Sequence, residues 1–516
     1  TATFDNLPQL PFSKLHMVLK GGSRAALVTP STCGTYTTHA EMTSWASPTP
    51  VVSDSSFTID QGCGNEAQFT PGLEAGTTNA LAGIFSPFVF RVTGQDGQQN
   101  TARIEATLPE GMLAKLAGVP QCDDASAASG NCPAASQVGT TTAGVGAGAT
   151  PVYVPQPGKA ATAVYLAGPY AGAPWSLVVK VPAQAGPFDL GTVTVRNGLY
   201  IDPLTTQATV KSDPLPQILE GVPITYRDLR VEINRPGFTV NPTSCEPLAV
   251  SSTITSAAGQ VAHPSSRFQV GDCASLKFAP KFAASAAGAA NGGNAKAIGA
   301  KLKVKLSYPN APAGTQANIA KVKVSLPRQL PSRLATLQKA CTAAQFAANP
   351  AGCPVESLVG KAKVVTPLLP TPLTGPAYFV SHGGEAFPSL IMVLQGSGVT
   401  VQLVGKTFIN KAGITSTTFD AVPDVPFNTF ELELPQGRFS ALAVNGSLCG
   451  SRLVMPTDYV AQNGVVLHQS PVIGVASCPK GKAAKLAAAL KQCHGKKAGK
   501  RGACERQARK KYARKG

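Results

Sequence analysis

The sequence predicts an all-β protein of tandem β-sandwich domains of two alternating types, one with a short helix, followed by a small, basic, helical C-terminal tail. Three observations predict this fold class. Short segments alternate apolar and polar residues, which is the pattern of strands with one buried face. The 51 glycines and 43 prolines in 516 residues exceed the usual share of about 12% and indicate many turns. Cysteines recur at spacings that divide the chain into repeated modules.

Three cysteine pairs, each separated by 28–30 residues, define what we call the long-loop module. A valine lies five residues before the first cysteine of every pair, at Val28, Val240 and Val444. A short apolar segment precedes the second cysteine, as in 57–59 and 268–270. The disulfides predicted for this module are Cys33–Cys63, Cys245–Cys273 and Cys449–Cys478.

Two closer pairs define a short-loop module, because the run 132–139 (Cys-Pro-Ala-Ala-Ser-Gln-Val-Gly) matches 353–360 (Cys-Pro-Val-Glu-Ser-Leu-Val-Gly). Twelve cysteines permit many connectivities, so the pairing depends on these flanking repeats as well as on spacing. Zinc binding is the alternative, but the wide separations lack the ~2–4-residue knuckles of zinc sites. The disulfides predicted for this module and the tail are Cys122–Cys132, Cys341–Cys353 and Cys493–Cys504.

The modules alternate with a period of roughly 210 residues, too long for a solenoid repeat of ~20–45 residues. The predicted order is a long-loop module at 1–66, a short-loop sandwich at 83–214, a long-loop module at 215–282, an Ala/Gly/Asn-rich linker at 283–297, a short-loop sandwich at 298–419, a long-loop module at 420–479 and the tail at 480–516. Because the run 3–12 matches 418–427, where a short-loop module enters a long-loop one, we expect the chain to begin within a repeat. We therefore expect a portion of the natural protein to precede Thr1, so that a missing signal peptide does not argue against secretion.

Strands are predicted in both module types from their alternation. The clearest segments are 88–92, 103–106, 229–233, 302–306 and 430–434. Each short-loop module also carries one predicted helical segment leading into its cysteine, at 110–117 and 331–340. We therefore expect β-sandwiches, one type with a short helix in a stapled loop.

The net charge of +18 is concentrated in the tail, where residues 480–516 hold 14 lysines and arginines and one acid, Glu505. The other 479 residues have a net charge of only +5. The tail is rich in alanine, lysine and arginine, which are good helix formers. Its candidate polyanion-binding residues are Lys480, Lys482, Lys485, Lys491, Lys496, Lys497, Lys500, Arg501, Arg506, Arg509, Lys510, Lys511, Arg514 and Lys515. A solvated tail without a partner is the alternative.

The sequence predicts no catalytic residue, no metal site and no cofactor. None of the six histidines falls in the same place in two module copies. His39 and Glu41 could share one strand face as metal ligands, but a partly exposed polar strand face is the favoured interpretation, because no Cys-x-x-Cys partner follows. The chain has no P-loop, dinucleotide fingerprint, Ca²⁺ loop or Gly-x-Ser-x-Gly elbow. No stretch approaches the ~18 apolar residues of a membrane helix.

Tyr165, Tyr170 and Trp175 form the one aromatic candidate for ligand binding, in a Gly/Pro-rich stretch. Exposed aromatic rings can hold sugars. The alternative is that they are packing residues, since Tyr378 and Phe387 lie at comparable positions in the second short-loop module.

The runs 108–139 and 28–33, together with the cysteine-paired Lys/Arg tail, resemble secreted and cell-surface repeat proteins of high-GC Gram-positive bacteria. The run 104–111 also resembles the strand-Leu-Pro-x-Gly turn of Ig-like repeats in bacterial surface proteins. The resemblance implies location and architecture: Ig-like sandwiches, outside the cell or at its surface. Disulfides persist in such an oxidising compartment.

Two functions follow as hypotheses. The first is a non-catalytic structural or adhesive surface protein, whose basic end binds an anionic cell-wall polymer or membrane surface and has no specific nucleic-acid partner. The alternative is a secreted carbohydrate-binding accessory region of a larger protein.

Overall fold

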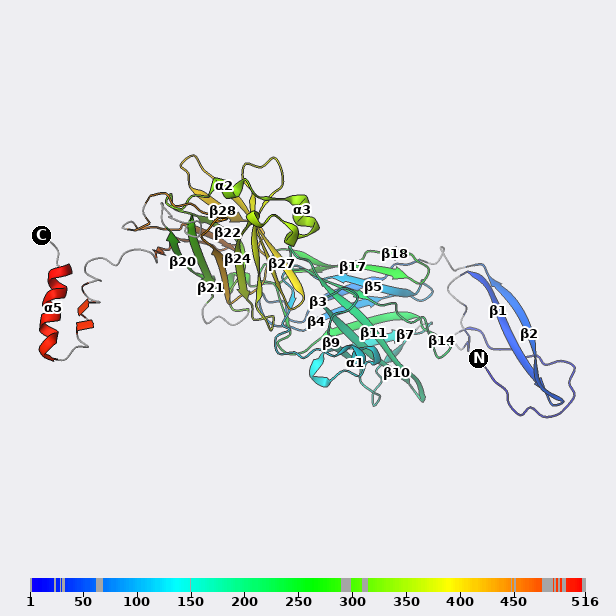
Figure 1. Cartoon of the computed structure of the whole chain (residues 1–516). Coiled ribbons are helices and arrows are strands. Elements are labelled where there is room, and N and C mark those ends of the chain that lie inside the picture. The colour runs from blue at the N-terminus through cyan, green and yellow to red at the C-terminus, as the bar shows by residue number, and fades with distance from the viewer. Residues whose placement is uncertain are drawn as a thin grey trace.

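The structure is a computed structural model. It describes residues 2–22, 25–27, 29, 33–61, 68–148, 150–288, 298–308, 314–446, 448–449, 452–475, 486, 489–490, 492–493 and 498–512. Figure 1 shows a hairpin near the N-terminus, two β domains in chain order, and helix α5 (Ala498–Tyr512) toward the C-terminus. We call residues 68–277 domain 1 and residues 278–475 domain 2.

The N-terminal hairpin consists of β1 (Gly34–Ser44) and β2 (Ser47–Ile59), which pair antiparallel. Almost all of its side chains are exposed. The described residues between 2 and 22 contain no strand. Of the module predicted at 1–66, the described part of the chain therefore forms only the hairpin.

Domain 1 contains seventeen strands in its described residues, several of them only two residues long. They are β3 (Gly72–Thr77), β4 (Phe88–Thr93), β5 (Thr101–Thr107), β6 (Leu113–Ala114), β7 (Gln137–Val145), β8 (Val152–Val154), β9 (Ala163–Ala167), β10 (Trp175–Ala185), β11 (Phe188–Ile201), β12 (Ala208–Ser212), β13 (Ile218–Leu219), β14 (Val222–Pro223), β15 (Tyr226–Ile233), β16 (Thr239–Val240), β17 (Leu248–Ser256), β18 (Val261–Ala262) and β19 (Ser265–Phe268).

Domain 2 contains thirteen strands in its described residues. They are β20 (Lys281–Gly288), β21 (Ala300–Ser307), β22 (Ile319–Ser325), β23 (Cys341–Thr342), β24 (Leu358–Val365), β25 (Leu373–Ser381), β26 (Ser389–Gly396), β27 (Val399–Ile409), β28 (Thr415–Phe419), β29 (Thr429–Leu434), β30 (Thr457–Ala461), β31 (Val466–Gln469) and β32 (Ile473–Val475).

The two domains share one strand order. In domain 1 the main path runs β18-β17-β5-β12-β11-β10-β9-β7-β15-β4-β3. In domain 2 it runs β31-β30-β22-β28-β27-β26-β25-β24-β29-β21-β20-β32. From β17 to β3, each strand of domain 1 has a counterpart at the same place in domain 2, so the two domains are copies of one fold.

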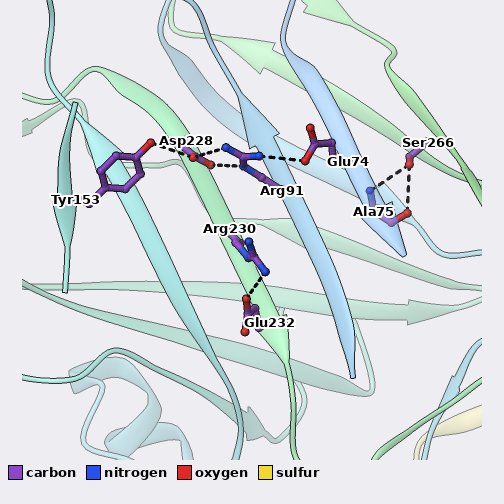
Figure 2. Close-up of polar contacts among 8 residues, drawn as sticks. All are labelled: Glu74, Ala75, Arg91, Tyr153, Asp228, Arg230, Glu232 and Ser266. Carbon is purple, nitrogen blue, oxygen red and sulfur yellow. Dashed lines mark hydrogen bonds and ion pairs between the residues drawn. The ribbon is translucent and has the colours of Figure 1, made fainter. Parts of the chain in front are cut away.

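Each sheet bends over until its ends meet. In domain 1, Ser266 of β19 accepts a hydrogen bond from the Ala75 backbone N–H of β3 (3.1 Å) and donates one to the Ala75 carbonyl (3.2 Å), as Figure 2 shows. In domain 2, β32 follows β31 in the chain and pairs parallel with β20 at the other end of the path. Each domain is therefore a β-sandwich whose two layers belong to one continuous sheet.

The sheets do not follow the predicted module boundaries. Strand β15, in the module predicted at 215–282, pairs with β4 and β7 of the module predicted at 83–214. In the same way β29, in the module predicted at 420–479, pairs with β21 and β24. A module of about 60 residues buries too little apolar surface to be stable alone. The long-loop strands therefore complete the sheet of the preceding short-loop module, and the two form one domain.

The predicted linker also differs from the structure in its described part. Residues 281–288 form β20, which pairs along its whole length with β21. Ala284 and Ala286, two residues apart on one face of the strand, are buried. Small side chains that look like linker composition therefore fill the inner face of a strand.

The short helices lie inside the stapled loops. They are α1 (Asp124–Ser129) and α3 (Ala343–Ala348), and the single turn α2 (Leu334–Leu337) falls within the predicted helix 331–340. A 3-10 turn follows the second cysteine of each loop, at Ala134–Ser136 and Val355–Ser357.

The helix predicted at 110–117 is absent, since these described residues form a turn and the two-residue strand β6. Gly111 has a φ of +78°, which ends helical backbone. A Cβ there would lie 2.7 Å from an Asp424 oxygen of domain 2, so the close approach of the two domains requires glycine.

Four of the six predicted cysteine pairs are bonded in the structure: Cys122–Cys132, Cys245–Cys273, Cys341–Cys353 and Cys493–Cys504. Cys33 and Cys449 are also disulfide-bonded. Their predicted partners, Cys63 and Cys478, lie outside the described residues.

The two domains pack directly against each other. The backbone N–H groups of Leu116 and Ala117 both donate to the Leu368 carbonyl, at 2.8 and 2.9 Å. One buried apolar cluster includes residues of both domains, among them Trp175 of domain 1 and Leu373 of domain 2. The domains therefore share a core at their junction.

Candidate functional site

The C-terminal helix α5 carries the predicted polyanion-binding residues that the structure describes. The Cys493–Cys504 disulfide, with Cα atoms 5.6 Å apart, joins it to the preceding helical residues. Cys493 and Ala508 are buried, and Leu486 and Leu490 are half-buried. The described residues of the tail thus make only a small apolar contact of their own.

The cations of α5 face solvent. The exposed ones are Arg501, Arg506, Arg509, Lys510 and Lys511. The Arg501 guanidinium also contacts Glu505 one turn later, with Nε 3.0 Å from Oε1. Among the described residues of α5, Glu505 is the one acidic side chain. The helix therefore presents a field of one sign, which attracts anionic polymers.

The remaining predicted tail cations cannot be placed. Lys500 belongs to α5, but its side chain lies outside the described part of the chain. Also outside the described residues are Lys480, Lys482, Lys485, Lys491, Lys496, Lys497, Arg514 and Lys515.

A second basic surface lies on the outer face of domain 2 and was not predicted from the sequence. We call it the lysine face; it consists of Lys301, Lys303, Lys305, Lys361 and Lys363. Strand β29 runs between the two strands that carry these lysines and supplies two acids. Glu433 lies opposite Lys303 on one side and Lys361 on the other, and Glu431 has the same relation to Lys305 and Lys363.

Ion pairs neutralise only part of the lysine face. Lys301 and Lys303 contact Glu433 at 2.7 and 3.2 Å, and Lys305 contacts Glu431 at 2.9 Å. The hydrogen bond from Lys301 lowers the pKa of Glu433, and the one from Lys305 lowers the pKa of Glu431. Both acids therefore stay charged at neutral pH, and five cations against two anions leave a net positive face.

The corresponding face of domain 1 is balanced. Arg91 of β4 donates from Nε and Nη2 to the two carboxylate oxygens of Asp228, at 2.9 and 2.8 Å, and from Nη1 to Glu74 at 3.1 Å (Figure 2). The Tyr153 hydroxyl donates to the same carboxylate at 3.2 Å. On the same strand as Asp228, Arg230 pairs with Glu232 at 2.6 Å. These two cations are matched by three acids, so these residues leave no net positive charge on the face.

The two domains also differ in net charge. Domain 1 holds 12 lysines and arginines against 14 acids, whereas domain 2 holds 16 against 7. Residues 476–516 hold 14 against one. The positive charge therefore belongs to the whole C-terminal half of the chain.

The three predicted glycan-binding aromatics do not form a common platform. Trp175 is 7% exposed and belongs to the core at the domain junction. Tyr165 packs with Cys122 and Val178 beneath the stapled loop. The Tyr170 hydroxyl donates to Asp213 at 2.7 Å, and the Arg196 guanidinium lies 4.3 Å from its ring centroid. All three side chains are thus engaged in packing or internal contacts.

The other sequence candidate is a cross-strand pair. His39 of β1 contacts Asp54 of β2, with Nδ1 2.5 Å from Oδ1, and this acid raises the pKa of the exposed imidazole. Within the described part of the chain there is no group of three side chains placed to hold a metal ion. Nor is any helix among the described residues long and apolar enough to span a membrane.

No protein-family model and no curated protein matches the sequence. Weak structural alignments exist. The C-terminal domain of the Streptococcus pyogenes antigen I/II-family protein AspA aligns over 78% of this chain and 98% of its own, with 8% identity and a TM-score of 0.17. A putative membrane-anchored protein from Corynebacterium diphtheriae aligns over 86% and 98%, with 9% identity and a TM-score of 0.15.

A third alignment is with the type II cohesin dyad of the adaptor ScaA scaffoldin of Acetivibrio cellulolyticus. It covers 79% of this chain and 97% of that one, with 7% identity and a TM-score of 0.17. Scores this low carry no argument about function, which therefore rests on the residues of the chain itself.

Proposed function

We propose that this chain is a non-catalytic structural or adhesive protein of the cell surface, whose basic C-terminal half binds anionic wall polymer or anionic membrane. The observation that carries the proposal is the row of exposed, largely unmatched cations on α5. The lysine face of domain 2 adds a second surface of the same sign.

The disulfides and the shape of the chain support this proposal. Disulfides persist in an oxidising compartment, outside the cytoplasm. The two domains and the N-terminal hairpin follow one another in chain order, with α5 at the C-terminal end (Figure 1). A protein attached through α5 and domain 2 would present domain 1 and the exposed hairpin away from the surface to which it is bound.

Binding to purified cell wall and to vesicles of phosphatidylglycerol tests the proposal. The test variant is Arg506→Gln/Arg509→Gln, which removes two exposed cations of α5. The matched control is Lys159→Gln/Arg267→Gln, which makes the same charge change at exposed positions of domain 1. Each cation near an anionic surface contributes about 1 kcal/mol, so the α5 variant should bind vesicles roughly 30-fold more weakly.

The control variant should bind like the unmodified chain. Equal losses in the two variants would show that net charge alone matters and that α5 has no special role. Equal binding to vesicles of phosphatidylcholine would show that anionic charge is not what the chain recognises.

A further inference from the structure

The interior of the sandwiches is not completely filled by side chains. A cavity of about 590 Å³ runs through the cores of both domains and across their junction. Protein interiors ordinarily contain few voids larger than a water molecule. Pockets that hold small molecules measure about 300–1,000 Å³. The total volume of this cavity falls within that range.

The strand path explains why the space exists. Ten strands, from β17 to β3, form the bent-over sheet of domain 1, and the contact of Ser266 with Ala75 closes it (Figure 2). A sheet that closes on itself with about eight strands is just filled by its own side chains, and the enclosed width grows with the number of strands. Ten strands therefore enclose more space than their inward-facing side chains occupy.

The side chains of strand β10 show this unfilled space in the core. Its inward-facing Leu177, Val179 and Val181 line the cavity and keep accessible surface. Val178 points to the opposite face, under the stapled loop, and is 0% exposed. The inner face of a strand is normally the better buried one, so this reversal marks a real gap in the core of domain 1.

A surface groove adjoins the cavity at the domain junction. This open groove shares Leu116 and Trp175 with the cavity wall. Its other lining residues include Pro174 and Pro370 and the uncharged polar side chains Gln121, Thr371 and Ser397. Trp175 thus separates the groove from the interior.

The lining defines the chemistry of the ligand. Among the residues that the structure describes, no charged side chain lines the cavity or the groove. Tyr459 lines the cavity, is 0% exposed, and its hydroxyl has no hydrogen-bond partner among the described residues. A buried polar group without a partner costs about 1–3 kcal/mol, so an uncharged ligand oxygen that displaced the side chains around this hydroxyl would remove that cost.

We propose that this cavity binds a long-chain aliphatic molecule with an uncharged, oxygen-containing end, which enters through the groove between Leu116 and Trp175. The site is independent of the basic surfaces of α5 and domain 2. Apolar cavities of this kind stay dry and take up apolar ligands.

The test uses 1-monopalmitoylglycerol as the probe and the full chain carrying Trp45→Phe. The protein has two tryptophans, and Trp45 is 65% exposed on the hairpin, so the variant leaves Trp175 as the reporter. The probe should change Trp175 fluorescence saturably and raise the melting temperature. Palmitate, which would bring a carboxylate into an uncharged site, should bind about tenfold more weakly or worse.

A matched pair of variants locates the site. Val193 of β11 lines the cavity, and its neighbour Thr192 is exposed on the other side of the strand. Val193→Phe should weaken probe binding about tenfold or more, because overpacking costs ~1–3 kcal/mol. Thr192→Phe should change it by less than about twofold. Circular dichroism checks folding, and the smaller Ala183→Leu replaces Val193→Phe if that variant unfolds.

No saturable signal from the probe would overturn the proposal. Equal effects of Val193→Phe and Thr192→Phe would also overturn it, because binding would then lie outside the cavity. Palmitate binding as tight as that of the monoglyceride would refute the uncharged end group.

Discussion

Thr243 of domain 1 donates two hydrogen bonds to Asp424 of domain 2, from its backbone N–H to Oδ2 at 2.6 Å and from its hydroxyl to Oδ1 at 2.5 Å. Asn318 donates to Oδ1 at 2.8 Å, and the Ser244 backbone N–H donates to Oδ2 at 3.2 Å. Burial raises the pKa of Asp424, and these hydrogen bonds oppose the shift. One carboxylate thus joins the two domains.

Replacing Asp424 should weaken the domain junction. Asp424→Ala leaves four buried or half-buried donors without their acceptor, so the free energy of unfolding should fall by about 3 kcal/mol. Chemical denaturation followed by circular dichroism measures the change. The control is Asp420→Ala, which removes partly exposed ion pairs with Lys321 and Lys406 and should cost less than about 1 kcal/mol. Equal costs would refute the role given to Asp424.

The Arg91–Asp228 pair of domain 1 should make stability depend on pH. The hydrogen bonds from Arg91 lower the pKa of Asp228 below its value in the unfolded chain, which is about 3.9. The pair therefore stabilises the domain above about pH 4, and this contribution is lost as the pH falls further toward the folded-state pKa.

Asp228→Asn measures this contribution. At pH 7 the variant should be less stable than the unmodified chain by about 2 kcal/mol, since bonds between charged groups contribute ~1.5–3 kcal/mol. The difference should shrink when the denaturation is repeated near pH 3. A difference that is the same at both values would show that Asp228 acts through packing and not through its charge.

Each disulfide should stabilise the protein by an amount that rises with the length of the loop it closes. Cys245 and Cys273 are 28 residues apart, whereas Cys122 and Cys132 are 10 apart. The chain-entropy model gives ~3.6 kcal/mol for the longer loop and ~2.8 kcal/mol for the shorter one. Replacing both cysteines by alanine should therefore lower the melting temperature more in the first case. The reverse order would contradict this account of their stabilising effect.

The repeated fold could be predicted from the sequence, because cysteine flanks and strand alternation are local signals. The domain boundaries could not, since they depend on which strands pair across long separations. Nothing local in 229–233 shows that this strand lies between β4 and β7. The alternation of apolar and polar residues in 229–233 predicts the strand correctly. The place of that strand in the sheet depends on tertiary contacts.

Helices α1 and α3 begin at N-cap residues that can be recognised in the sequence but were not used to predict them. Thr342 caps α3 in a reciprocal arrangement with Gln345, and Asp123 caps α1 by accepting from the Ser126 N–H at 3.0 Å. Both caps are visible as Asp or Thr at the start of an alanine-rich stretch. Helix α1 was not among the predicted elements, although Asp123 precedes the alanine- and serine-rich residues that form it.

The importance of Asp424 could be suspected from the sequence only because the two domains differ at this position. In domain 1 the corresponding residue is Gln217, which follows Leu-Pro as Asp424 follows Val-Pro. Asn100 donates to Gln217 at 2.6 Å as Asn318 donates to Asp424. The function of the acid depends on Thr243, which only the packing of two domains brings near. The lysine face was missed because its five residues come from β21 and β24, two strands far apart in the sequence that β29 brings together in the sheet.

The salt dependence of binding tests the central claim most directly. Retention on purified cell wall is compared for residues 1–516 and 1–479 at low and high salt. Exposed charges are screened over ~8 Å at physiological ionic strength, so the full chain should be retained at low salt and released at high salt. The shorter chain keeps the lysine face and should be retained more weakly at low salt. Equal retention of the two chains, or retention that salt does not change, would contradict the proposed function.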